Sequence, residues 1–144
     1  MNTVFKFNRT IEGKHLDSFG HVNNAAYLAL YEEARWDFIT ARGFGLSRIK
    51  CEKMGPVILD LSLNFKRELV EGERILVKSV FTGMKNRLVM RMEQTMYNAN
   101  AKVASELRFT MGFMDLAKRK LVKPTDDWLT ACGASFESVT DLLE

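Results

Sequence analysis

Polar residues that could take part in chemistry are concentrated between positions 15 and 24, directly before a segment with helical periodicity. Asp17 supplies a carboxylate, and Asn24 stands seven residues later, where the helix is predicted to begin. The first turn of a helix has unpaired backbone N–H groups and a partial positive charge, so it can polarise an acyl oxygen. Gly20 allows the chain to turn tightly between them. The spacing therefore lets Asp17 face the start of the helix.

Two other interpretations of these residues stay open on spacing alone. An aspartate before a helix often serves as a cap or as a hydrogen-bond acceptor within its loop. His15, Asp17 and His21 also form an H-x-D-x-x-x-H set of zinc-ligand types, although no established ligand spacing matches it. We expect no metal, and we interpret His21 as a residue that shapes the loop and contacts ligand.

The segment from position 17 to position 35 reads D-x-x-G-H-V-N-N-x-x-Y-x-x-x-x-E-x-A-R. This pattern resembles the signature of hot-dog-fold thioesterases of the 4-hydroxybenzoyl-CoA thioesterase type. The order of long strands downstream resembles that family over almost the whole chain. The loop motif is the specific part of the resemblance, because long alternating strands occur in many folds.

The resemblance implies an acyl-CoA thioesterase whose only coenzyme is the coenzyme A of its substrate. Asp17 would act as nucleophile or general base, and the amide at Asn24 would bind the carbonyl oxygen. Some family members carry histidine at the position of Asn24, so this chain has a neutral donor where they have a proton carrier. The substrate-binding residues that the resemblance implies are Gly20, His21, Val22, Asn23 and Tyr27.

The elements that must position these residues follow from apolar periodicity. A helix is predicted over residues 24–42, with Asn23 or Asn24 as its N-cap and Gly43 as its stop. Strands are predicted over residues 3–11, 57–66, 74–84, 88–97 and 103–113, the last four as an antiparallel meander. Residues 43–55 are expected to be a connection with room for a helical turn, and a short helix is expected from about Asp126. We predict an α+β fold, in which a curved sheet of about five strands wraps around one long helix.

Several side chains receive roles from their place in these elements. The four strand methionines Met90, Met92, Met96 and Met111 are predicted to be core, with part of that surface available to an acyl group. Glu33 and Arg35 are interpreted as packing or salt-bridge residues, and Tyr27 as a core residue whose hydroxyl can reach the site. Basic residues near turns that could meet the phosphates of coenzyme A are Arg87, Lys118 and Arg119.

Composition narrows the class of protein. The 144 residues are 47% hydrophobic and 27% charged, which is typical of a globular chain, and we expect one domain over residues 1–144. A net charge of +3 with scattered basic residues does not favour nucleic acid as a partner. We expect reduced cysteines, no targeting or membrane-spanning segment, and a cytoplasmic protein.

The predicted sheet has two edges, so we expect a homodimer or a homotetramer. Three other functions remain as alternatives: a thioesterase for acyl carrier protein, a hot-dog hydratase, and an acyl-CoA-binding protein without activity. The hydratase fits least well, because it needs an aspartate and a histidine around a different loop motif.

Overall fold

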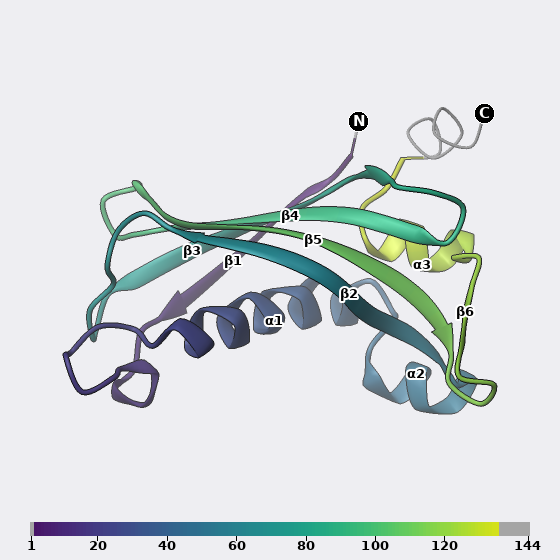
Figure 1. Ribbon diagram of the computed structural model, residues 1–144, viewed down its shortest axis with the longest axis horizontal. Helices are drawn as coiled ribbons and strands as arrows, with labels where there is room; N and C mark the ends of the chain where they lie inside the picture. The colour runs from purple at the N-terminus through teal and green to yellow at the C-terminus, as the bar shows by residue number, and fades with distance from the viewer. Residues whose placement is uncertain (1, 136–144) are drawn as a thin grey trace.

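The computed structural model describes residues 2–135, so residue 1 and residues 136–144 of the predicted domain lie outside the described residues. One curved antiparallel sheet arches over a long helix, which lies along its concave face (Figure 1). The strands are β1 (Val4–Thr10), β2 (Met54–Phe65), β3 (Arg74–Met84), β4 (Val89–Tyr97), β5 (Val103–Asp115) and β6 (Lys120–Val122). The helices are a 3-10 turn (Gly13–His15), α1 (Asn24–Ala41), α2 (Leu46–Glu52) and α3 (Asp126–Ala131).

The predicted long helix is α1. It begins after Asn23, whose side chain caps it, and it ends where Gly43 takes a φ of +88°, a conformation that favours glycine. Its buried residues recur at the predicted helical spacing and pack under the sheet: Tyr27, Leu30, Tyr31, Ala34, Phe38 and Ile39. The periodicity therefore predicted both the extent of the helix and its buried face.

The sheet order is β1-β3-β4-β5-β2, with β6 paired to β5. The predicted meander is correct for β3, β4 and β5 but wrong for β2, which pairs with β5 rather than with β3. The connection over residues 66–73 is not a tight turn. Leu69 in it is fully buried, and the backbone N–H groups of Lys66 and Arg67 both donate to the carbonyl of Ala104. These contacts hold the end of β2 against β5.

Three short elements, α2, β6 and α3, complete the fold. The connection over residues 43–55 holds α2, which is the expected helical turn, and Lys53 ends it with a φ of 56°. Strand β6 was not predicted, because three residues are too few for alternation to be recognised. The short helix expected from about Asp126 is α3, which is capped by Thr125.

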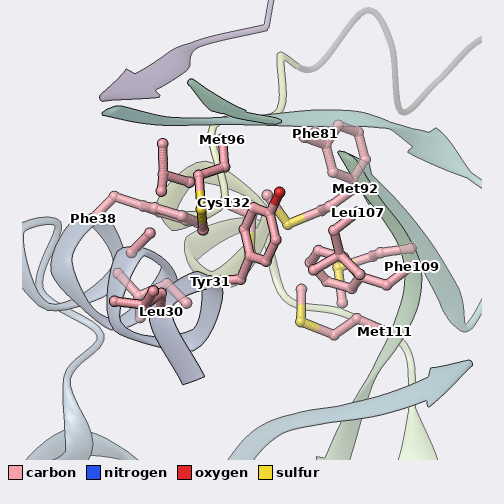
Figure 2. Close-up of a cluster of buried hydrophobic side chains, with 14 of the residues drawn as sticks. Leu30, Tyr31, Phe38, Phe81, Met92, Met96, Leu107, Phe109, Met111 and Cys132 are labelled. Carbon is pink, nitrogen blue, oxygen red and sulfur yellow. The ribbon is translucent and has the colours of Figure 1, made fainter. Parts of the chain in front are cut away.

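The core lies between α1 and the concave face of the sheet (Figure 2). Met90, Met92, Met96 and Met111 are all buried there, as predicted. The Tyr31 hydroxyl points up from α1 and hydrogen bonds with Ser105 Oγ at 2.5 Å. Among the described residues, no helix combines the length and the hydropathy that crossing a membrane requires.

Candidate active site

A pocket of about 590 Å³ opens at the N-terminal end of α1. One wall is the loop before the helix together with the first helical turn. The other wall is the end of β2 with the residues that follow it. The pocket is lined by Asp17, His21, Val22, Asn23, Asn24, Tyr27, Phe65, Lys66, Arg67 and Glu68. The fold therefore brings six of the seven predicted site residues into one place.

Backbone hydrogen bonds fix the shape of the loop. Leu16 and Val22 form an isolated antiparallel bridge, and the Asp17 N–H donates to the His21 carbonyl at 2.8 Å. His15 is buried, and its Nδ1 accepts the Glu12 N–H at 2.9 Å. Burial lowers the pKa of the His15 imidazole, which favours the neutral ring that this bond requires. Since the His15 carbonyl also accepts the Asn23 N–H, the loop is tied to the helix start.

Asp17 has one carboxylate oxygen engaged and one available. Its Oδ1 accepts the backbone N–H groups of Phe19, at 2.9 Å, and His21, at 3.3 Å. None of the described residues donates a hydrogen bond to its Oδ2. The carboxylate thus shapes its own loop and still presents an oxygen that can act as base or nucleophile.

The structure separates the roles of the two asparagines. Asn23 is the N-cap, because its Oδ1 accepts the Ala25 N–H at 2.8 Å and its backbone is extended. Asn24 is the first helical residue, and its Oδ1 also accepts the Ala25 N–H, at 2.9 Å. No described residue accepts the backbone N–H of Asn24. This amide is one of the free donors of the first turn, and it can bind an oxygen.

The other predicted residues take different places. Gly20 has a φ of +82° and turns the loop, as expected, and it is not among the residues that line the pocket. Val22 and Tyr27 are core residues that reach the pocket, 6% and 4% exposed. Burial raises the pKa of the Tyr27 hydroxyl, which stays a neutral donor.

Four residues of the strand wall were missed at the sequence level. Phe65 packs edge-on against Tyr27 with ring centroids 5.0 Å apart, and Lys66, Arg67 and Glu68 follow it. A visible signal was the charged run K-R-E directly after an apolar strand. The erroneous pairing of β2 with β3 hid its position, because only pairing with β5 brings this segment to the loop.

The basic residues that were expected to meet the phosphates of coenzyme A do not line this pocket. Arg74, at the start of β3, pairs with Thr10 near the loop, so β3 runs away from the pocket. Arg87 follows that strand, and Lys118 and Arg119 follow β5, which runs the same way. All three therefore lie at the opposite end of the sheet from Asp17.

The H-x-D-x-x-x-H set does not converge on one point. His15 is turned inward to the Glu12 amide, whereas the His21 imidazole pairs with Glu68 at 2.7 Å across the pocket. Within residues 2–135, no group of three histidine, cysteine, aspartate or glutamate side chains is placed to hold a metal ion.

Comparison with known proteins identifies the family to which this chain belongs. The family model for the thioesterase-like superfamily matches residues 13–132, so the chain belongs to that superfamily. The predicted hot-dog fold and the predicted enzyme class, a thioester hydrolase, are thereby confirmed.

Individual relatives are distant in sequence and close in fold. The long-chain acyl-CoA thioesterase FadM of Escherichia coli (strain K12) is 24% identical over 110 residues, which cover 76% of this chain and 83% of the relative. A Staphylococcus aureus protein solved in complex with CoA superposes with a TM-score of 0.84 at 14% identity, over 96% of this chain and 87% of that one. A 1,4-dihydroxy-2-naphthoyl-CoA thioesterase from Synechocystis gives a TM-score of 0.81 at 19% identity, over 90% and 96% of the two chains.

Proposed function

We propose that this protein hydrolyses an acyl-CoA thioester to the free carboxylic acid and coenzyme A. One observation carries the proposal. The available Asp17 Oδ2 and the unpaired Asn24 N–H belong to residues that line the same pocket, so a base or nucleophile and an oxyanion donor can act on one substrate there.

In this mechanism the thioester carbonyl oxygen accepts the Asn24 N–H at the positive end of α1. Two routes are then open to Asp17. As a general base, it takes a proton from water while the water oxygen bonds to the acyl carbon and the C–S bond breaks. As a nucleophile, its oxygen bonds to the acyl carbon, the thiolate leaves, and water cleaves the resulting anhydride. Both routes give one carboxylic acid and one thiol.

Neither route requires a metal or a bound cofactor, and neither requires a histidine at position 24. A thiol has a pKa of about 8.5, so the thiolate of coenzyme A leaves without strong acid assistance. The neutral amide of Asn24 can therefore stand where other family members carry a proton donor.

Binding of the phosphate groups of coenzyme A is supported by the strand wall. Lys66 and Arg67 line the same pocket as Asp17 and are exposed. Cationic side chains at a pocket mouth attract phosphate groups, and the arginine guanidinium can bind them in a bidentate manner. The relatives named for acyl-CoA and dihydroxynaphthoyl-CoA substrates, and the neighbour solved with CoA, agree with this choice.

We also propose that the active unit is a homodimer formed through the free edge of β2. This strand pairs only with β5 among the described strands, and it exposes Ile58, Leu59, Leu61 and Phe65 by 37–52%. A long apolar edge is a template for pairing with a second strand. Two-fold pairing of β2 edges would satisfy the free backbone edge and bring the strand walls of two pockets toward each other.

Turnover of a panel of acyl-CoA thioesters, followed by detection of free thiol, tests the proposal. We expect release of coenzyme A from at least one chain-length class, and release at least about 10²-fold slower by Asp17→Asn. Binding without release would indicate a non-catalytic acyl-CoA protein. Release only from acyl carrier protein thioesters would exclude the CoA assignment.

A single turnover in ¹⁸O water separates the two routes. Label recovered in the Asp17 carboxylate identifies a nucleophile, because water then attacks the aspartyl carbon of the anhydride. Label found only in the product acid supports direct attack by water.

A further inference from the structure

A second, smaller cavity of about 180 Å³ lies along α1, beyond the candidate active site. Most of its surface is apolar and comes from α1, β2 and β5: Trp36, Ile39, Pro56, Ile58 and Met111. Two charged side chains, Glu32 and Arg35, share this lining. The mixture of apolar and charged groups in its lining limits what can bind there.

Arg35 forms no ion pair with the nearest acidic residue on its own helix. Glu32 lies one helical turn before it, a spacing at which opposite charges usually pair. The guanidinium instead donates from Nη1 to Gln94 Oε1 at 2.8 Å and lies 4.9 Å from the centre of the Phe109 ring. No carboxylate among residues 2–135 lies within 4.0 Å of it. Arg35 therefore acts as a packing residue against the sheet, which is one of the two roles expected for it.

Gln94 is what draws the guanidinium inward. It is 1% exposed, and its Nε2 donates to the Tyr31 carbonyl at 3.1 Å and to Ser79 Oγ at 2.9 Å. With both amide protons directed to those oxygens, its own oxygen faces Arg35. Figure 2 shows Phe109 on the side of β5 that faces α1, so the ring and the amide hold the guanidinium from the sheet side.

Glu32 is held separately. Its Oε1 accepts the Trp36 Nε1–H at 3.2 Å, one turn further along the helix. The two opposite charges thus line one cavity while each is bound to another partner. Arginine has five N–H donors, and only one is bonded to the protein here, while Glu32 keeps a second acceptor oxygen. The cavity presents donors and an acceptor together, with nearly balanced charge.

This pair discriminates among ligand groups. A hydroxyl can accept from Arg35 and donate to Glu32 at the same time. A carboxylate would also meet Arg35, but it would be repelled by the charge of Glu32. A methyl group would leave the charged groups without new partners and displace their water. The hydroxyl is the group that satisfies both sides.

The distance to the active site sets where that hydroxyl must be. Arg35 is eleven residues after Asn24, which is about 16 Å along a helix, and helical side chains lean toward the N-terminus. An extended chain advances about 1.2 Å per bond, so about 10 to 14 bonds span the gap. This is the length of a medium to long acyl chain.

An apolar strip joins the two cavities. Phe65 lines the first and Ile58 the second, with Leu63 and Leu61 between them on β2. Their register partners on β5 are Ser105, Leu107, Phe109 and Met111, which are buried residues of the concave face, so all four β2 side chains lie on the α1 side. Since Leu61 and Phe65 are 45% and 52% exposed, the strip can contact an acyl chain.

We propose that the cavity between α1 and β2 recognises a hydroxyl group at the far end of the acyl chain, through Arg35 and Glu32. The proposal rests on the thioesterase function above. It assigns the substrate as a terminally hydroxylated acyl thioester about twelve carbons long.

The test compares three thioesters of equal length in the wild-type protein: dodecanoyl-CoA, ω-hydroxydodecanoyl-CoA and the monothioester of dodecanedioic acid. We expect kcat/KM for the hydroxylated substrate to exceed the other two by about tenfold, the effect of hydrogen bonds to charged groups. Equal or better turnover of dodecanoyl-CoA overturns the proposal, and so does a preference for the terminal carboxylate. Hydrolysis of none of a full acyl-CoA panel would instead refute the thioesterase function.

Two variants locate the effect. Arg35→Met should abolish the preference for the hydroxyl, whereas Arg87→Met, at an exposed turn outside both cavities, should retain it. Glu32→Gln removes the repelling charge from an exposed residue, so its folding is secure even if Arg35→Met does not fold. It should improve turnover of the carboxylate-terminated substrate about tenfold. An unchanged order of the three substrates in Glu32→Gln contradicts the proposal.

Discussion

The two walls of the active-site pocket are built in different ways. The loop wall is held by hydrogen bonds within one short segment, from the His15 amide contacts to the Asn23 cap. The strand wall, from Phe65 to Glu68, consists of exposed side chains at the free end of an edge strand. It contacts the opposite wall through Phe65 against Tyr27 and through the exposed pair of His21 with Glu68.

This difference separates chemistry from recognition. Groups that react must be held in fixed positions, and the loop wall provides this inside one chain. Groups that select a substrate can remain open until a substrate or a second subunit covers them. We therefore expect changes in the loop wall to act on kcat, and changes along β2 to act on assembly and on the choice of substrate.

The largest effect should come from Asp17. Asp17→Asn removes the charge but keeps an oxygen for the Phe19 and His21 amides, so the loop should stay intact. We expect kcat to fall by about 10²-fold or more, the scale for a positioned base or nucleophile, with the melting temperature unchanged. Asp17→Ala should be at least as inactive. If only the alanine variant lost activity, Asp17 would be a structural residue.

A smaller but still clear effect is expected at the β2 edge. Leu59→Lys introduces a charge at a residue that is 44% exposed, in the bulge of this strand. Lysine on an edge strand opposes pairing, so we expect dissociation in sedimentation velocity and an activity loss of about tenfold at low protein concentration. Val4→Lys, on the other edge and 51% exposed, is the matched control and should change neither property. A fully active Leu59→Lys monomer would refute the shared site.

The asparagines should differ modestly. Asn23→Ala removes the N-cap and should lower the free energy of unfolding by about 1 kcal/mol, measured by chemical denaturation. Asn24→Ala should cost less stability, since Asn23 still accepts the Ala25 N–H. Its kcat should fall less than that of Asp17→Asn, because the backbone donor remains. An equally deep loss in a stable Asn24→Ala protein would assign a chemical role to the amide side chain.

The smallest effect is on pH dependence. Burial lowers the pKa of His15 below its unfolded value, so this residue stabilises the fold above the unfolded pKa of about 6.5. Stability should decline as pH falls through the folded value, because a protonated ring cannot accept the Glu12 N–H. His15→Asn supplies a non-titrating acceptor, so its melting temperature should fall less between pH 7 and about pH 5. If the melting temperatures of both proteins fell equally over this pH range, His15 would not contribute to the pH dependence of stability.

Local chemistry was readable from the sequence, and pairing across the sheet was not. The apolar spacing of α1 and the Asp17 to Asn24 loop are local patterns, and both were predicted. A period of two, however, shows which side chains share a face without showing which strand is adjacent, so β2 was placed beside β3. The strand wall was missed because of that error.

The buried polar contacts of Arg35 were not predicted either, although the sequence of β4 contains one indication of them. Gln94 alternates with Met92 and Met96, which places an amide on the core face of β4. A buried amide requires partners, and this position could have suggested an inward-turned Arg35. Glu33 forms a salt bridge with Arg9 at 3.2 Å and Arg35 packs against the sheet, so both fit their interpretation as packing or salt-bridge residues.

The pairing of β2 with β5 also sets the order in which the site can form. Phe65 and its partner Ser105 are about 40 residues apart in the chain. At synthesis rates of about 5 to 20 residues per second, β2 leaves the ribosome seconds before the strand that pairs with it. The loop wall can form early from local contacts. The apolar residues of β2, in contrast, stay unpaired until β5 has been synthesised. During this interval the apolar residues of β2 are exposed on a newly made chain and can associate with other chains.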